Sequence, residues 1–140
     1  MRSRLPFALL ALSLGVPPFA AAATKNDITP IAPKAGATVE TGTKPLFKVR
    51  SKGKGTVWVA VSESRKRDKD GVIKSTSDTF FQQAKRKKGT LYQVKAKFFD
   101  YPEYWLNSPG TYYWQAYRID CTGNLKDCKR EGPVVKFRVG

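Results

Sequence analysis

Histidine is absent from this 140-residue sequence, and cysteine occurs only twice. Without an imidazole the chain cannot activate a serine or cysteine nucleophile in the usual way, or build a histidine metal site. Two thiols alone cannot fill the four ligand positions of a structural zinc site. The carboxylate pairs Asp68/Asp70 and Asp100/Glu103 fall in expected turns, where acidic residues are ordinary. We therefore expect no enzyme, no metal and no cofactor, although Ser-Lys dyads stay open because their spacing carries no signal.

A calcium loop is also excluded by what is missing. The segment Asp68-Lys69-Asp70-Gly71 has the outline of such a loop, but Lys66 stands at its first position and Ser77 at its twelfth. A calcium loop needs a bidentate carboxylate at the twelfth position. The segment is therefore interpreted as the tight turn of a polar hairpin over residues 63–71.

Long apolar runs are absent after the start of the chain, so no later stretch is expected to cross a membrane. At the start, Arg2 and Arg4 precede an apolar run over 5–16, and small alanines follow. This order is typical of a secretory signal peptide, which we assign to residues 1–23. We expect the remaining domain, 24–140, to be secreted or periplasmic.

The two cysteines fit that compartment. Thiols of an exported protein are expected to be paired, and Cys121 and Cys128 enclose only six residues. We therefore predict a disulfide that closes a tight loop.

Short β-favouring segments and turns alternate along the mature chain. In the most regular segment, Val57, Val59 and Val61 are expected on one face, with Trp58 and Ala60 on the other. Residues 79–89 show no clear strand pattern, because an apolar start is followed by a basic run. Seven strands are predicted, at 28–31 (with 37–40 resuming it), 45–50, 56–62, 72–76, 91–99, the stretch after Gly110, and 134–139. This spacing indicates an all-β, immunoglobulin-like antiparallel sandwich.

The strand after Pro109 and Gly110 is aromatic on both faces. One face carries Tyr112, Trp114 and Ala116, and the other carries Tyr113, Gln115 and Tyr117. A strand that is apolar on both sides belongs at the centre of a sheet.

Several short motifs follow one another in a fixed order. They are Pro33, Gly36-Ala37-Thr38-Val39, Pro45, Phe47, the strand at 58–62, Pro-Gly-Thr-Tyr-Tyr-Trp at 109–114, Gly123-Asn124 and Phe137-Arg138-Val139. Over residues 28–139 this order resembles the fibronectin type III-like modules of bacterial exported proteins. The resemblance implies a seven-stranded sandwich, with Tyr112 or Tyr113 forming its tyrosine corner. The chain departs from the pattern in the loop that Cys121 and Cys128 would close, and in Arg118, where a small apolar residue is usual.

Acidic residues are scarce relative to basic ones. The chain has 26 Lys and Arg against 11 Asp and Glu, a net charge of +15. Loss of Arg2 and Arg4 with the signal peptide leaves 24 against 11, or +13. This excess suggests a polyanionic partner, such as an anionic polymer of the cell envelope. The alternative is general basicity of an exported protein.

The resemblance implies that the B–C, C′–E and F–G loops of such a sandwich gather at one end, the F–G end. Nine basic residues are expected in these loops: Lys52, Lys54, Lys85, Arg86, Lys87, Lys88, Lys126, Lys129 and Arg130. At the opposite end we expect the cations of residues 65–69 to be offset by acids. The hypothesis is a polyanion-binding patch at the F–G end. The alternative is that these lysines are solvated and discourage edge pairing.

A second hypothesis concerns an aromatic corner formed by Tyr101, Tyr104 and Trp105. Exposed rings there would recognise a sugar or another protein, as would an open sheet edge. The competing interpretation is that these rings plug the end of the core, since each buries a large apolar area.

Overall fold

The computed structural model describes residues 27–76, 79–95, 108–121 and 128–140. The predicted signal peptide, the aromatic corner and Lys126 lie outside these residues. The described part contains eight strands: β1 (Ile28–Ala32), β2 (Thr38–Val39), β3 (Leu46–Ser51), β4 (Thr56–Ser62), β5 (Thr79–Lys88), β6 (Leu91–Lys95), β7 (Gly110–Ile119) and β8 (Lys129–Val139). None of the described residues forms an apolar helix of the length that a bilayer crossing requires.

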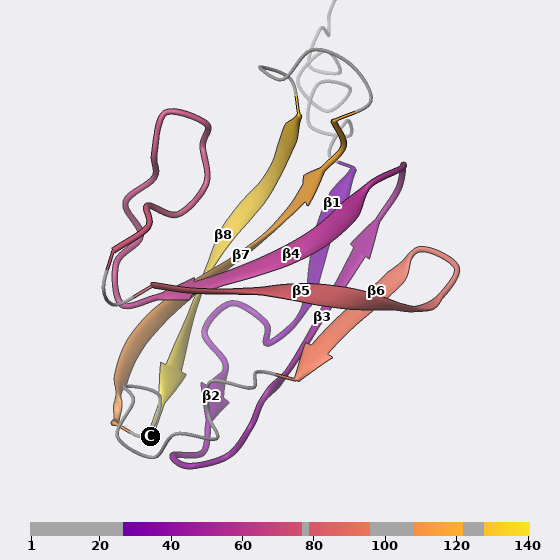
Figure 1. The fold of residues 1–140 in the computed structure, drawn as a ribbon. Coiled ribbons are helices and arrows are strands. Elements are labelled where there is room, and N and C mark those ends of the chain that lie inside the picture. Colours follow the sequence, from indigo (N-terminus) through magenta and orange to yellow (C-terminus); the bar gives the residue numbers. More distant parts are fainter. Residues whose placement is uncertain (1–26, 77–78, 96–107, 122–127) are drawn as a thin grey trace, which may run out of the picture.

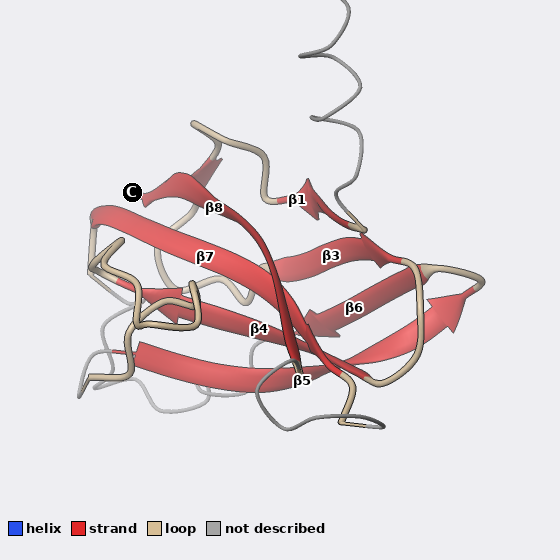
Figure 2. Ribbon diagram, turned by 90° about the horizontal axis from the view of Figure 1, so that it is seen from above, coloured by secondary structure: helices blue, strands red, loops and turns tan. Residues whose placement is uncertain are grey.

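The strands form one sheet in the order β1-β3-β6-β5-β4-β7-β8-β2. Strand β5 joins its two halves, because Thr79 to Ala84 pair with β4 and Lys85 to Lys88 pair with β6. The sheet therefore curls, and β1, β3 and β6 face β4, β7 and β8 across the core (Figures 1 and 2).

The all-β class is confirmed, but three details of the sequence prediction are wrong. Strand β2 is separate from β1 and pairs parallel to β8, so the sheet is not wholly antiparallel. Residues 79–88 are a strand, because the basic run of β5 is solvent-exposed and needs no apolar alternation. Residues 72–76 form no ladder strand and contribute only the bridge between Arg67 and Ile73. The described part thus has eight strands instead of seven.

The core between the two halves is built on Trp114, which is fully buried. Its ring meets Phe47 edge to face at 5.3 Å between centroids. Its indole N–H donates to the carbonyl of Pro33 at 3.0 Å, so it ties β7 to the segment after β1. The predicted inward face of β4, with Val57, Val59 and Val61, packs into this core. Burial of such large apolar side chains is the main stabilising term in a domain of this size.

A second apolar cluster lies on the outer face of the half formed by β4, β7 and β8. Here Ala60 of β4 and Tyr117 of β7 pack against Val72 and Ile73, which come from the connection between β4 and β5. We call the described part of this connection, residues 63–76, the covering segment; it lies at the left of Figure 1. Its presence explains why β7 is buried on both faces, as predicted.

The tyrosine corner is formed by Tyr112. Its hydroxyl donates a hydrogen bond to the carbonyl of Ser108, four residues earlier, at 2.8 Å. Tyr113 lies on the opposite face of β7 and is half-buried. Burial raises the pKa of Tyr112, and the charge of Glu63 raises it further. Of the two candidates, Tyr112 therefore fixes the start of β7.

Removal of the Tyr112 hydroxyl is expected to destabilise the domain. Tyr112→Phe should lower the free energy of unfolding by about 1.5 kcal/mol, because the Ser108 carbonyl loses a hydrogen bond from a nearly buried donor. The matched variant Tyr113→Phe should change it by less than about 0.5 kcal/mol. Urea denaturation of both variants checks this, and equal losses would contradict the assignment.

Alkaline pH should destabilise the fold through Tyr117. Burial, and secondarily the charge of Asp68, raise the pKa of Tyr117 to about 12. The folded-state pKa lies above the unfolded value, so the stabilising contribution is complete below about pH 10 and is lost as the pH rises towards about 12. Over that window the free energy of unfolding should fall by about 2 kcal/mol more in the unaltered protein than in the Tyr117→Phe variant. Urea denaturation at each pH checks this. An equal fall in the two proteins would contradict the prediction.

Candidate functional site

The structure places eight of the nine predicted patch residues, and only Lys52 and Lys54 lie in a loop. The prediction that the others are loop residues is wrong: Lys85, Arg86, Lys87 and Lys88 belong to β5, while Lys129 and Arg130 begin β8. All eight lie towards one end of the sheet, since β3, β5 and β7 finish there. The backbone N–H of Ser51 accordingly donates to the carbonyl of Thr90 at 2.9 Å.

These residues do not form one continuous surface. Side chains of a strand alternate between faces, and a register shift between Arg86 and Lys88 interrupts the pairing of β5 with β6. The β5–β6 hairpin also lies apart from the end of β7 and the start of β8 (Figure 1). The predicted patch is thus divided between the exposed basic end of β5, residues 85–88, and the start of β8. We call residues 85–88 the β5 arm.

Arg118, which departs from the pattern of the modules that the sequence resembles, is a structural residue. It is only 7% exposed, and its Nη1 donates to the Ser51 hydroxyl at 3.3 Å. Its Nη2 lies 3.8 Å from a carboxylate oxygen of Asp27. A Cβ added at Gly53 would stand 2.7 Å from the guanidinium carbon, so the β3–β4 connection packs directly on this group. Arg118 therefore braces the loop that carries Lys52.

The covering segment changes the distribution of charge. The sequence predicts that this segment lies at the end opposite to the F–G end, but its Asp70 forms an ion pair with Lys129 at 3.4 Å. The segment folds back along the outer face of the sheet. The prediction that the two groups of charges lie at opposite ends is therefore wrong for Asp70.

Gln115 is the residue that holds the covering segment in place. Its fully buried side-chain oxygen accepts a hydrogen bond from the N–H of Ile73 at 2.7 Å. Its amide nitrogen donates to the carbonyls of Gly71 at 2.9 Å and Gly132 at 2.8 Å. Both donor hydrogens and one acceptor site are thus used. A buried amide with these bonds joins the segment to β7 and β8 at a fixed position.

The tip of the covering segment is the predicted turn. The Asp68 carboxylate accepts hydrogen bonds from the N–H groups of Asp70 at 2.8 Å and Val72 at 3.1 Å. Gly71 has a φ of 82°, which favours glycine, and its N–H donates to the Asp68 carbonyl at 3.1 Å. The carboxylate of Asp68 thus stabilises a turn. Within the described ranges, His, Cys, Asp and Glu form no group of three that suits a metal ion.

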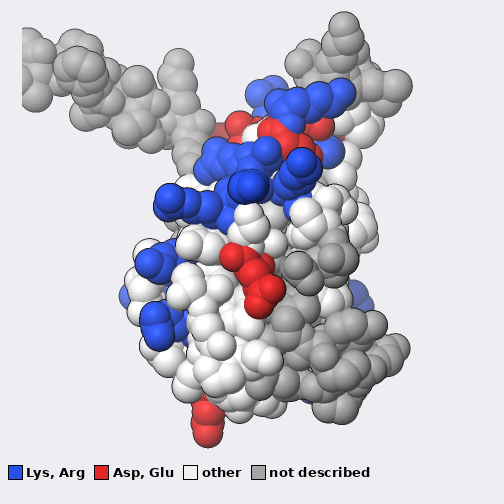
Figure 3. Space-filling view, turned by 90° about the vertical axis from the view of Figure 1, so that its left-hand side faces the viewer, with Lys and Arg blue, Asp and Glu red and all other residues white. Residues whose placement is uncertain are grey.

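Basic side chains from the covering segment and β8 gather on one side of the molecule (Figure 3). We call this surface the basic face. It consists of six exposed residues: Arg65, Lys66, Arg67, Lys69, Lys129 and Lys136. Arg130 pairs with Arg118 in the ladder between β7 and β8, so its side chain lies on the opposite face of the sheet from Lys129. Four acids occupy the same segments, namely Glu63, Asp68, Asp70 and Glu131, and two of these are engaged by the turn and by Lys129. The basic face has a net positive charge, six minus four, or +2.

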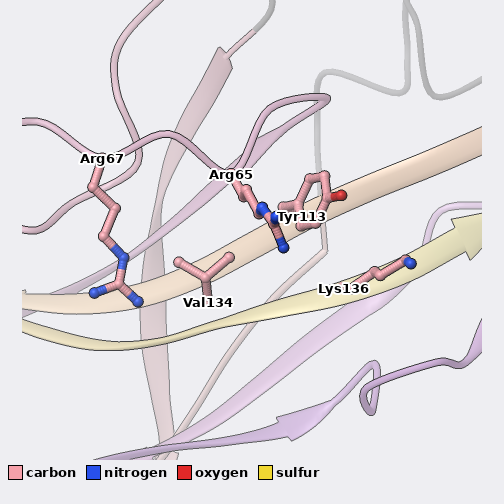
Figure 4. Close-up of a pocket in the computed structure, with 5 residues that line it drawn as sticks. All are labelled: Arg65, Arg67, Tyr113, Val134 and Lys136. Atoms are coloured by element: carbon pink, nitrogen blue, oxygen red, sulfur yellow. The ribbon is translucent and has the colours of Figure 1, made fainter.

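Between the covering segment and the sheet the basic face is hollowed. A cavity of about 300 Å³ is lined by Arg65, Arg67, Tyr113, Val134 and Lys136 (Figure 4). This site was not predicted from the sequence, because nothing in the spacing of these residues shows that 65–67 lies over 134–136. The available signal was Gln115, a polar residue on a strand that is otherwise apolar on that face.

The remaining predicted sites have different outcomes. Cys121 and Cys128 form the predicted disulfide, with their Cα atoms 4.6 Å apart. The corner of Tyr101, Tyr104 and Trp105 lies outside the described residues. The sheet edges offer little for strand addition, since β1 contains Pro30 and β2 has only two residues.

Comparison with known proteins agrees with the fold and goes no further. No family model and no curated protein matches the sequence. Among solved structures, an engineered protein has 15% sequence identity and a TM-score of 0.50, over 81% of this chain and 20% of that one. The fibronectin(III)-like modules of Clostridium thermocellum CbhA have 16% identity and a TM-score of 0.41, over 81% of this chain and 45% of theirs. The chain thus spans less than half the length of either structure.

Loss of the Gln115 amide should release the covering segment. Gln115→Leu keeps the volume but leaves the Ile73 N–H and two carbonyls without their partner, which should cost about 3 kcal/mol. Trypsin should then cut within residues 65–74 much faster than in the unaltered protein. The control Gln83→Leu, at an exposed position on β5, should resist trypsin normally. Equal resistance of both variants would contradict the anchoring role.

Proposed function

We propose that this protein is a non-catalytic binding module that works outside the cytoplasm and contacts an anionic polymer of the cell envelope through the basic face. The signal-like start of the chain and the disulfide between Cys121 and Cys128 support the compartment. The absence of histidine from the sequence, and the use of Asp68 in a turn, support a role without catalysis.

We further infer that the fold is a variant of the fibronectin type III-like sandwich. Strands β1, β3 and β6 correspond to one sheet of such a domain, and β4, β7 and β8 with the start of β5 to the other. The Tyr112 hydrogen bond to Ser108 lies where a tyrosine corner is expected. In this variant β5 links the two sheets, and the covering segment is an addition. Such a scaffold presents a surface without supplying chemistry.

The observation that carries the proposal is the convergence of cations from two separate parts of the chain. Arg65, Lys66 and Arg67 come from the covering segment, and Lys129 and Lys136 come from β8. Figure 3 shows Lys and Arg side chains gathered on this side of the molecule. A concentration of one charge sign on one side attracts a polymer of the opposite sign and orients it.

The proposal differs from the sequence hypothesis in the surface it uses. Of the predicted patch, the basic face keeps only Lys129, and the cations of the covering segment take the place of those on the β5 arm. The basic face is anchored by Gln115, whereas the cations of the arm alternate between the two sides of a projecting hairpin. An anchored surface loses less side-chain and backbone entropy on binding, so we prefer it.

Polyanion binding over a salt series tests the proposal. The mature domain should bind at least one of linear polyphosphate, dextran sulfate and polygalacturonate at low salt, with an affinity that falls steeply as salt is added. Replacing Lys66, Arg67 and Lys69 by Gln should weaken binding about tenfold, since each exposed charge contributes about 0.5 kcal/mol.

The matched control replaces Lys85, Arg86 and Lys88 by Gln. It also removes two lysines and one arginine from exposed positions, but on the β5 arm. Its affinity should stay within about threefold of the unaltered domain. A larger loss in the control than in the basic-face variant would move the site to the arm, and no binding to any of the three polymers would overturn the proposed function.

A further inference from the structure

We infer that the cavity in the basic face is a binding site for one anionic sugar unit, a pyranose ring that carries a carboxylate or a sulfate. This inference rests on the proposed function, because it names the chemical group of the polymer that the basic face selects. The cavity lies between the covering segment and strands β7 and β8, and its lining combines cations with an aromatic ring and an aliphatic side chain.

The charged part of the lining comes from both sides of the cavity. Arg65 and Arg67 extend from the covering segment towards the sheet, and Lys136 lies on β8 (Figure 4). Among the described residues, no carboxylate forms an ion pair with any of these three cations. A guanidinium presents paired N–H donors that match the two oxygens of a carboxylate or sulfate. Two arginines with a lysine therefore favour an anion in this cavity.

The uncharged part of the lining distinguishes a sugar from a bare anion. Tyr113 and Val134 lie on adjacent strands, and Tyr113 pairs directly with Lys136 in the ladder between β7 and β8. The flat face of a half-buried tyrosine ring can pack against the C–H groups of a pyranose, while its hydroxyl can bond to a sugar hydroxyl. Phosphate or sulfate alone would make no use of this apolar surface.

The size of the cavity sets the length of ligand that it holds. A volume of about 300 Å³ lies at the lower end of the range for small-molecule sites. It suits one sugar ring with its acidic group, and the rest of the polymer would then lie along the surrounding basic face. This division gives the ring a selective site and leaves Lys66 and Lys69 with a general electrostatic role.

The walls of the cavity are held in place before any ligand arrives. Val72 and Ile73 pack on the outer face of the sheet, and Gln115 bonds to the backbone on both sides of Val72. The position of Arg65 and Arg67 over β7 and β8 follows from this anchor, together with the bridge between Arg67 and Ile73. A cavity formed in advance reduces the ordering cost of binding.

Trigalacturonate, a sulfated trisaccharide and tripolyphosphate are the probes, with affinity measured by calorimetry and the binding site by amide chemical shifts. At least one sugar anion should shift the amides of Tyr113 and Val134. Replacing Arg65 and Arg67 by Gln should weaken that binding about tenfold, because two charge-assisted contacts are lost. The control that replaces Lys66 and Lys69 by Gln removes the same charge beside the cavity and should cost less than about threefold.

Tyr113→Leu separates sugar recognition from simple attraction. It should weaken the sugar anion about fivefold and leave tripolyphosphate within about twofold, because only the sugar uses the ring. Shifts away from the cavity, equal losses in the two double variants, or failure of both sugar anions would overturn the inference. The proposed function would survive these results if the polymers still bound in the salt series, and both would fall if no polymer bound.

Discussion

The arrangement of this protein's surface depends on one buried amide, that of Gln115. The side chain lies on the outer face of β7, where its neighbours Tyr113 and Tyr117 would otherwise face solvent or a partner. By bonding to Ile73, Gly71 and Gly132 it satisfies backbone groups that would be costly to bury alone. The apolar pair Val72 and Ile73 can then pack on the sheet. From this follow the position of the covering segment, the basic face and the cavity.

The basic residues divide into those that the fold uses and those that it presents. Arg118 is buried under Gly53 and braced by Ser51 and Asp27, so its charge belongs to the architecture. Lys129 is paired with Asp70 across the gap between β8 and the covering segment. Arg65 and Arg67 instead line an open cavity. Net charge alone therefore overstates the charge that a ligand meets, and the placement of each cation decides its role.

The sequence predicted those features that arise within single strands. Alternation in β4 and β7 placed Val57, Val59, Trp114 and the rest of their faces correctly, because burial has a period of two along a strand. The compartment argument gave the disulfide. The position of the covering segment and its cavity were not predicted, because they depend on contacts between residues far apart in the sequence. Gln115 bonds to Ile73 across 42 positions and to Gly71 across 44. Strand β5 was missed for a different reason, because its exposed basic half has no apolar pattern.

Hydrogen exchange at the Ile73 amide tests the central claim most directly. This N–H donates to a fully buried side-chain oxygen from a segment that has only one β-bridge of its own. If Gln115 anchors the covering segment, the Ile73 amide should exchange as slowly as amides of β4 and β7, through global unfolding. Exchange as fast as at the exposed residues Lys69 and Ser75 would show that the segment opens independently of the sheet. It would remove the basis for a preformed basic face and its cavity.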